Sequence, residues 1–215
     1  MPRQKKARSN EPRRATARGA ATRARIVEAA ADLVYRRGAG GTSLDDIMAA
    51  SATSKSQLYH YFADKDALMR AVIELQTRRV TGDHAARLET VDSLDGLRQW
   101  GASVVAMNKA SGGVGGCPLG SLASELADRS ESAREMLAHG FARWESHLAR
   151  ALRAMRDHGE LREEARPEDL ATMVIAAIEG GLLLAQTTRA SRPLELALDM
   201  AIEHVARSCG SRSAI

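Results

Sequence analysis

The segment from Thr42 to Phe62 constrains the fold most, because it is patterned as two short helices joined by a tight turn. Ser43 is a favourable N-cap, and the apolar residues that follow recur at i, i+3 and i+4: Leu44, Ile47 and Met48. The small and polar residues 51–53 disfavour a continuous helix, and Ser54 offers a second N-cap ahead of residues 55–62. Two helices separated by three residues must cross steeply, so the segment predicts a helix-turn-helix.

The second helix of this motif presents polar side chains that suit the major groove of DNA. Leu58 and Phe62 lie four residues apart and are expected to pack inward, which turns five side chains outward: Lys55, Ser56, Gln57, Tyr59 and His60. Lysine binds phosphate or guanine, glutamine can bond adenine through both amide atoms, and the other three bond phosphate or base edges. The motif therefore predicts double-stranded DNA as a partner.

The composition of the chain predicts an all-α fold. The chain has 215 residues, of which 44% are hydrophobic and only 3% aromatic, and alanine and leucine dominate the apolar set. A core of ordinary size is therefore expected. Outside the motif, apolar spacing and capping residues predict helices at 22–37, 64 to about 88 with an interruption at Gly82, 93–110, 118–129, 132–158, 167–189 and 193–208.

The positive charge is concentrated at the N-terminus. The net charge is +4, yet residues 1–25 carry nine Lys and Arg against one Glu, and the remainder carries 22 basic against 26 acidic side chains. Residues 1–21 are therefore predicted to be a disordered basic arm that is attracted to polyphosphate by counterion release. The alternative is a solubilising extension without a role in binding.

Several classes of protein lack support in the sequence. No apolar run approaches the ~20 residues of a membrane span, and no apolar stretch follows the N-terminal basic residues, so we expect a cytoplasmic protein without a membrane partner. Cys117 and Cys209 lie far apart, and His139 and His147 have no ligands at metal spacing, so neither disulfide, metal nor cofactor is expected. Nucleophile-elbow, Walker, dinucleotide and zincin motifs are missing, which argues against an enzyme.

The last two predicted helices are the most apolar, and their stripes predict a dimer interface at Leu170, Ile178, Gly181, Leu182, Leu198 and Ile202. Gly180 and Gly181 in mid-helix each cost roughly 1 kcal/mol relative to alanine, which close approach of another helix offsets. A two-fold dimer would present two recognition helices roughly 34 Å apart. In the alternative reading, these stripes close the core of the monomer.

The motif residues resemble the TetR family of transcriptional regulators. The resemblance rests on Gly-Gly-Thr-Ser-Leu-Asp-Asp-Ile at 40–47, Ser54-Lys55, Leu58-Tyr-His-Tyr-Phe62 and Asp64-Lys-Asp-Ala-Leu68, and it covers about residues 22–80. It implies an all-helical homodimer, usually a repressor, whose larger C-terminal domain binds a small molecule and thereby releases DNA. The implied division is a DNA-binding domain at 22–82 and an effector-binding and dimerisation domain at 83–210.

By this resemblance, Lys55, Ser56, Gln57 and Tyr59 lie at the groove, while Ser43, His60, Tyr61 and Lys65 contact the DNA backbone. In the alternative, Tyr59 and Tyr61 are packing residues. Lys65 opposes the dipole of the helix it begins, which a nearby phosphate would explain; the alternative is a simple solvated lysine. The turn and the recognition helix depart from the family at Ala52, Thr53 and Ser56-Gln57, so the operator cannot be inferred from relatives. Ala52 is strained by about 1 kcal/mol if its φ is positive.

The segment 115–126 resembles a motif in the C-terminal domain of LmrA and YxaF type regulators and, more loosely, of electrophile-sensing members. Pro118 is a favoured first helical residue, which makes Cys117 the N-cap. A helix N-terminus lowers the pKa of a thiol, so oxidation or alkylation of Cys117 is one hypothesis for the inducing event. In the alternative, Cys117 is a small buried cap without chemistry.

Large apolar and methionine side chains can line an adaptable cavity between helices, and these define the candidate effector pocket: Trp100, Val104, Met107, Cys117, Phe141, Trp144, Leu148 and Met173. The leading hypothesis is a homodimeric DNA-binding repressor that a small apolar effector releases from its operator. One alternative is a redox or electrophile sensor acting through Cys117. Another is a non-specific architectural nucleic-acid-binding protein that depends on the basic arm.

Overall fold

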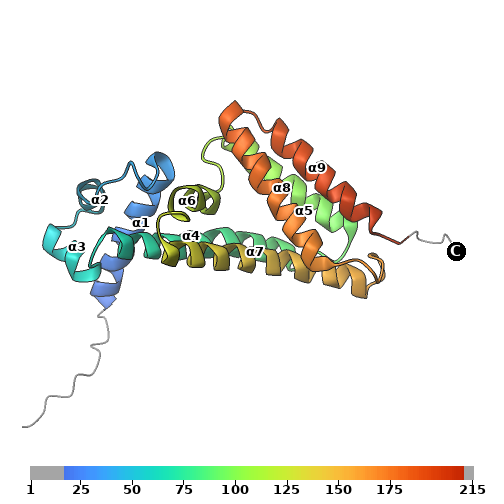
Figure 1. Ribbon diagram of the computed structural model, residues 1–215, viewed down its shortest axis with the longest axis horizontal. Coiled ribbons are helices and arrows are strands. Elements are labelled where there is room, and N and C mark those ends of the chain that lie inside the picture. The colour runs from blue at the N-terminus through green and yellow to red at the C-terminus, as the bar shows by residue number, and fades with distance from the viewer. Residues whose placement is uncertain (1–16, 211–215) are drawn as a thin grey trace, which may run out of the picture.

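The computed structural model describes residues 17–210, and this part of the chain is all-helical (Figure 1). Its only pairing of strand type is an isolated bridge between Leu161 and Cys209. The helices are α1 (Ala17–Arg37), α2 (Leu44–Ser51), α3 (Lys55–Tyr61), α4 (Lys65–Leu88), α5 (Leu94–Ala110), α6 (Pro118–Leu126), α7 (Glu131–Asp157), α8 (Pro167–Thr188) and α9 (Arg192–Arg207). The predicted fold class is confirmed.

The molecule is elongated, and two long helices run along its length. Figure 1 shows α4 beside α7, with α1, α2 and α3 at one end and α5, α8 and α9 at the other. The short helix α6 lies between these ends and packs on both α4 and α7. Because α4 reaches both ends without a break, a shift at one end can be passed to the other through packed helices.

Local sequence signals set the helix boundaries around the motif as predicted. Ser43, Ser54 and Asp64 are N-caps whose side chains accept hydrogen bonds from backbone N–H groups of the first turns of α2, α3 and α4. Between α2 and α3, Ala52 has φ 49°, which is the left-handed region that favours glycine. The predicted strain at Ala52 is therefore present, and it costs about 1 kcal/mol.

Two predicted boundaries are wrong. Helix α1 begins at Ala17, so residues 17–21 are helical and do not belong to a disordered arm. Residues 1–16 of that arm lie outside the described residues. Helix α4 also continues through Gly82, because its long contact with α7 outweighs the weak helix propensity of one glycine.

Helix α8 forms the centre of the C-terminal part. It packs between α7 and α9, and Ala171, Val174 and Ile178 are fully or almost fully buried. By length and composition alone, it is the one helix among residues 17–210 that is apolar enough to cross a membrane, contrary to the expectation that no run approaches this length. Its contacts with α7 and α9 are those of a core helix.

Candidate DNA interface and ligand cavity

Helix α3 is anchored by one face and leaves the other face in solvent. Leu58 and Phe62 are buried in the core, whereas the predicted groove residues are exposed: Lys55, Ser56, Gln57, Tyr59 and His60. Tyr59 keeps 46% of its surface exposed, so it is not a packing residue. Tyr61 is half-buried and meets the ring of His60 edge-on at 4.9 Å, which fits the packing alternative for Tyr61.

Gln57 has a second role that the sequence analysis did not foresee. Its Oε1 accepts a hydrogen bond from the backbone N–H of Ser54 at 2.9 Å, and Ser54 Oγ accepts one from the backbone N–H of Gln57 at 3.2 Å. The two residues thus form a capping box at the start of α3. The amide oxygen of Gln57 therefore already accepts one bond within the protein, and its second lone pair and the amide N–H remain for a base.

Two residues that were predicted to contact the DNA backbone form bonds to other residues of the protein. Ser43 Oγ donates to Asp46 Oδ2 at 2.5 Å, and this bond lowers the pKa of Asp46. The ammonium of Lys65 donates to the backbone oxygen of Ala39 at 2.7 Å. This bond accounts for Lys65 in the first turn of α4 without a phosphate.

Two arginines of α1 brace the helix-turn-helix. Nε of Arg25 donates to the backbone oxygen of Ser51 at 2.8 Å, at the last residue of α2. The guanidinium of Arg23 lies 5.2 Å from the ring centre of Phe62, at the end of α3. The sequence analysis counted both only as charge, because a charge count does not reveal a tertiary contact.

A cavity of about 380 Å³ lies among α4, α5, α7, α8 and the start of α6. This volume is in the range of small-molecule sites. Four predicted pocket residues line it: Val104, Met107, Cys117 and Trp144. Further apolar walls come from Val80, Ile178 and Leu182.

The other four predicted pocket residues do not line this cavity. Trp100 and Leu148 are buried in the core, and Phe141 and Met173 pack against the core from partly buried positions. Large apolar side chains occupy core and cavity positions alike, so their size alone did not distinguish these four residues from residues that line the cavity. The polar residues that line the cavity were missed because no apolar pattern marks them. They are Tyr35, Gln76, Arg79, Asp83, His84, Asn108 and Ser111.

His84 is sandwiched in an aromatic cluster. Its ring stacks on Trp144 with centroids 4.5 Å apart, and it meets Trp100 edge-on at 5.7 Å. Burial, and to a smaller extent the nearby charge of Arg87, lower the pKa of His84 to about 4. The imidazole is therefore neutral near pH 7.

Cys117 is the N-cap of α6 with Pro118 as first helical residue, as predicted, but its thiol is not activated. The side chain is 7% exposed, and burial raises the pKa of the thiol, as does the neighbouring carboxyl of Glu179. The predicted direction of the pKa shift is therefore wrong, because desolvation outweighs the helix N-terminus. Burial likewise raises the pKa of Glu179.

The other end of α6 contacts the end of the molecule that contains the helix-turn-helix. Glu125 Oε1 accepts from the backbone N–H of Ala39 at 3.0 Å, and Oε2 accepts from that of Gly40 at 2.9 Å. Gly38, with φ 78°, lies so close that an added Cβ would be 2.8 Å from Glu125 Oε1. One short helix thus contacts the cavity with its first residues and the α1–α2 loop near its end.

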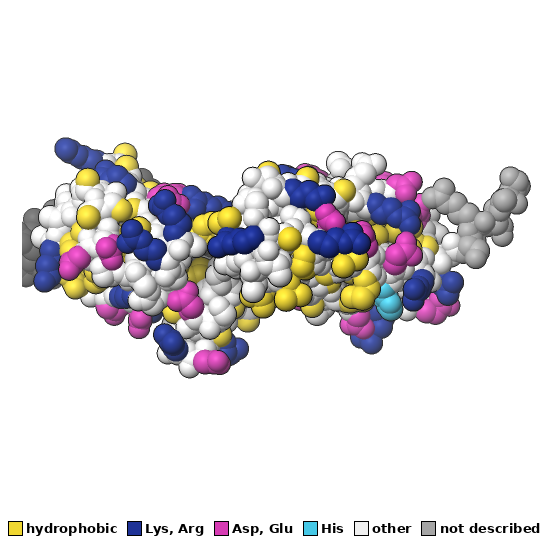
Figure 2. Space-filling model, turned by 90° about the horizontal axis from the view of Figure 1, so that it is seen from above, with side chains coloured by type: hydrophobic (Ala, Val, Ile, Leu, Met, Phe, Trp, Pro, Cys, Tyr) yellow, Lys and Arg dark blue, Asp and Glu magenta, His cyan; other side chains and the backbone are white. Residues whose placement is uncertain are grey.

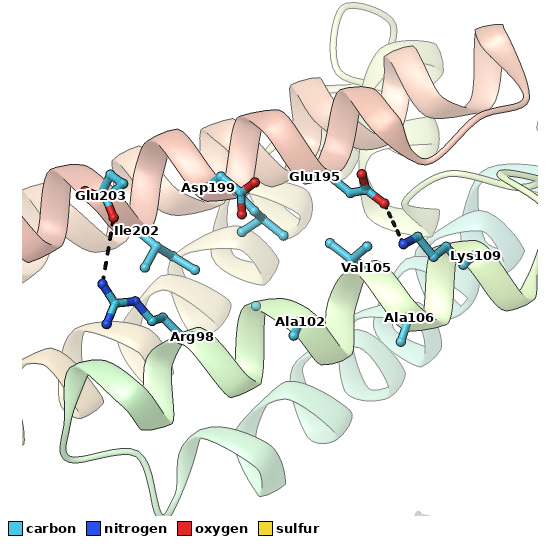
Figure 3. A pocket seen from close by; sticks show the side chains of 11 residues that line it. Arg98, Ala102, Val105, Ala106, Lys109, Glu195, Asp199, Ile202 and Glu203 are labelled. Atoms are coloured by element: carbon cyan, nitrogen blue, oxygen red, sulfur yellow. Dashed lines mark ion pairs between the residues drawn. The ribbon is translucent and has the colours of Figure 1, made fainter.

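A second hollow, of about 590 Å³, is an open groove between α5 and α9 (Figure 3). Arg98 pairs with Glu203 at 3.7 Å at one end, and Lys109 pairs with Glu195 at 2.6 Å at the other. The charged side chains at the two ends of the groove are thus paired with each other. The cavity beside α6 has apolar walls, and we therefore take it as the candidate ligand site. Within residues 17–210, no three His, Cys, Asp or Glu side chains are grouped as a metal site requires.

The residues predicted for the dimer interface belong to the core of the protomer. Leu170, Ile178, Gly181, Leu198 and Ile202 are buried, and Leu182 is half-buried and lines the cavity. Gly181 provides the expected close approach, but within one chain, since an added Cβ would be 2.8 Å from Cα of Leu194 on α9. The alternative reading, that these stripes close the monomer core, is therefore correct.

Other apolar residues of α8 and α9 face solvent. Leu184, Leu196 and Met200 are 55%, 51% and 69% exposed, and nothing lies within 4 Å of a Cβ added to Gly180. Figure 2, viewed from above Figure 1, shows hydrophobic side chains on the half of the molecule that contains α8 and α9. An exposed apolar surface of this kind is typical of an interaction site.

Both ends of the molecule match families of known proteins. Residues 26–72 match the family described as bacterial regulatory proteins, tetR family, and residues 93–200 match the C-terminal domain of LmrA/YxaF-like transcriptional regulators. The first match covers α2 and α3, and the second covers α5 to α8 and part of α9.

Individual relatives span nearly the whole chain. An uncharacterised HTH-type transcriptional regulator from the lacX 3' region of Lactococcus lactis subsp. lactis is 32% identical, over 83% of this chain and 90% of its own. The transcriptional repressor NemR of Escherichia coli is 27% identical, over 82% and 90%. A TetR transcriptional regulator from Chloroflexus aurantiacus superposes with a TM-score of 0.79 at 26% identity, over 90% and 98%. The chain therefore belongs to the TetR family of DNA-binding transcriptional regulators, a non-enzymatic class, and its C-terminal domain is of the LmrA/YxaF-like type.

Proposed function

We propose that this protein is a cytoplasmic homodimeric repressor that leaves its operator when a small, largely apolar effector enters the cavity beside α6. The observation that carries the proposal is the position of α6, whose start lines the cavity and whose Glu125 bonds the α1–α2 loop. The name of the relative NemR, a transcriptional repressor, supports repression as the direction of control.

The coupling runs through a short chain of contacts. A ligand in the cavity meets Cys117 and Pro118, the first turn of α6, and any displacement of this helix pulls on Glu125. Glu125 holds Ala39 and Gly40, and the oxygen of Ala39 also accepts from Lys65 at the start of α4. The α1–α2 loop therefore moves with α6, and α3 moves with the loop. Allosteric couplings of this kind typically change affinity 5- to 150-fold.

Tyr35 adds a second route from the cavity to the DNA-binding end. It belongs to α1 and lines the cavity, and its hydroxyl packs against the backbone of Gly115, where an added Cβ would overlap it. A ligand that displaces the glycine loop thus acts directly on α1.

The dimer uses the solvent-facing side of α8 and α9 in this proposal. Leu184, Leu196 and Met200 supply the exposed apolar surface, and Gly180 leaves room for a partner helix. In sedimentation velocity, we expect the wild type to be a dimer and the double variant Leu184→Glu, Met200→Glu to be a monomer of unchanged helix content. If the double variant remains a dimer, the interface lies on another surface.

The central experiment is a fluorescence anisotropy titration of the protein on DNA upstream of its own gene at fixed salt. Specific binding that exceeds binding to scrambled DNA by about a thousandfold is expected for a repressor. A chain without residues 1–16 should bind more weakly and with a flatter salt dependence but keep its preference. If this truncation abolishes binding, the architectural alternative is correct.

A further inference from the structure

A third hollow, of about 500 Å³, borders on the cavity beside α6, and we call it the outer hollow. Its walls come from α1, α6 and α8, and it reaches Gly38 and Glu125 at the DNA-binding end of the molecule. Among residues 17–210, only Tyr35 and Cys117 line both the cavity and the outer hollow. These two side chains therefore form the wall between the two hollows.

Tyr35 is the larger of the two side chains in this wall. It stands near the C-terminal end of α1, and 40% of its surface is exposed, so its ring has solvent on one side. Burial raises the pKa of the phenol, and the neighbouring Cys117 raises it as well. The phenol thus lies beside the thiol, which is itself only 7% exposed. The ring of Tyr35 can swing into solvent without displacing core side chains, and Cys117 cannot.

The hydroxyl of Tyr35 rests on the backbone of Gly115. A Cβ added to Gly115 would overlap this hydroxyl and the adjoining ring atoms. The φ of Gly115 is 94°, in the region that favours glycine, and the same loop has positive φ at Gly112, Gly113 and Gly116. Glycine at 115 is therefore what allows the ring to sit in the wall.

The loop of residues 111–116 that carries this seat also lines the cavity. Ser111, Val114 and Gly116 belong to the cavity wall, so a ligand there touches the loop. The backbone N–H groups of residues 112–114 donate to oxygens of residues 108–111, at the end of α5 and within the loop itself. These bonds are local, so they leave the loop able to shift against α1. A ligand that pushes on the loop therefore moves the seat of Tyr35.

We propose that Tyr35 is a gate between the cavity and the outer hollow, held closed by its seat on Gly115. When the ring leaves this seat, the two hollows become continuous and Cys117 is uncovered. Because Tyr35 belongs to α1, the same movement acts on the helix that packs on α2 and α4. This inference rests on the proposed function, because it names the residue that regulates the same effector cavity.

Gly112 provides a matched control for Gly115. Both residues have positive φ, 63° and 94°, so alanine is strained at either position. Nothing lies within 4 Å of a Cβ added to Gly112, whereas a Cβ added to Gly115 meets Tyr35. Gly112→Ala and Gly115→Ala therefore strain the same loop, and only Gly115→Ala drives the ring from its seat.

The test is alkylation of Cys117 by iodoacetamide in the full chain at pH 8, measured by peptide mass spectrometry with Cys209 as internal comparison. We expect Gly115→Ala to react at least about tenfold faster than the wild type, because an open gate exposes the thiol and weakens the desolvation that raises its pKa. Gly112→Ala should react at the rate of the wild type. A wild-type rate in Gly115→Ala, or an equal acceleration in Gly112→Ala, overturns the proposal.

Variants of Tyr35 test the gate even if Gly115→Ala does not fold. Tyr35→Ala should accelerate alkylation of Cys117 about tenfold, whereas Tyr35→Phe keeps the ring and should change the rate by no more than about twofold. In the double variant Gly115→Ala, Tyr35→Ala there is no ring to displace, so the rate should equal that of Tyr35→Ala. A wild-type rate in Tyr35→Ala, or additive acceleration in the double variant, overturns the assignment to Tyr35. Circular dichroism of each variant confirms that it is folded.

Because the alkylation contains neither DNA nor effector, it separates this inference from the proposed function. If Gly115→Ala exposes Cys117 as expected but binds the operator as the wild type does, the gate is correct and the route through α1 to DNA release is wrong. If alkylation is unchanged in Gly115→Ala while a small apolar ligand still releases the operator, effector release is correct and the gate is wrong.

Discussion

Glu125 and Ala39 lie 86 positions apart in the chain, and the carboxylate of one accepts the backbone N–H of the other at 3.0 Å. The same carboxylate accepts from Gly40 at 2.9 Å, so one side chain of the C-terminal part holds two amides of the DNA-binding end. Bonds to a charged acceptor are stronger than neutral ones. This contact is a direct link between α6 and the DNA-binding end of the molecule.

Glu125→Ala should loosen this link without unfolding the protein. We expect faster hydrogen exchange of the Ala39 and Gly40 amides, by about tenfold, and operator affinity at least about fivefold weaker, because α1 and α2 lose a fixed position relative to α6. Ser124→Ala is the control, since its hydroxyl bonds only within α6. Unchanged exchange at Ala39 in Glu125→Ala would contradict a role for this contact.

Gln57→Ala should relax the sequence preference of operator binding and also lower stability, since Gln57 both faces solvent on α3 and completes its capping box. Loss of a cap costs about 1 kcal/mol of the free energy of unfolding. Ser54→Ala removes the same cap but no predicted base contact, so it should lose stability and keep preference. Competition anisotropy with single-base operator variants separates the two effects; preference that survives in Gln57→Ala would refute the assignment of Gln57 to base readout.

Cys117 should react slowly with thiol reagents. Because burial and Glu179 raise the pKa of its thiol, little thiolate is present at pH 8, and we expect alkylation by iodoacetamide at least about a hundredfold slower than that of free cysteine. Peptide mass spectrometry of the native protein gives the rate at Cys117, with the half-buried Cys209 as internal comparison. A rate at Cys117 equal to or above that of free cysteine would restore the hypothesis of a thiol sensor.

His84 should make the protein less stable in mild acid. Its pKa is about 4 in the folded state against about 6.5 when unfolded, so the unfolded chain takes up the proton first as the pH falls. The free energy of unfolding should therefore drop by about 2 kcal/mol between pH 7.5 and pH 5 through this residue. Urea denaturation at pH 7.5 and pH 5 measures this decrease. The free energy of unfolding should fall by about 2 kcal/mol more in the wild type than in His84→Phe. Parallel pH dependences in the two proteins would contradict a buried, neutral His84.

The helix-turn-helix was predictable because its signals are local. N-caps at Ser43 and Ser54, and the spacing of Leu58 and Phe62, act over three or four residues, and the structure has each of them as predicted. The exposed face of α3 follows from the same spacing. The bond between Gln57 and Ser54 was equally local, and the pattern of a capping box could have revealed it.

The cavity was only half predictable because its polar wall has no periodic signal. Val104 and Trp144 were found because they are large apolar side chains, whereas His84 and Asn108 came to line the cavity only when α4, α5 and α7 packed together. The same limit explains why Trp100 and Leu148 were mistaken for pocket residues. A helix shows which residues turn inward but not whether they meet a neighbour or a cavity.

The sequence by itself determined the helices, the position of the recognition helix and the family, since capping, periodicity and motif spacing are encoded within short stretches. Only the tertiary structure decided which apolar stripes close the core, that Glu125 holds Ala39, and that burial raises rather than lowers the pKa of Cys117. These properties depend on which distant residues exclude water from a group. Desolvation is a property of the packed molecule, and no local pattern specifies it.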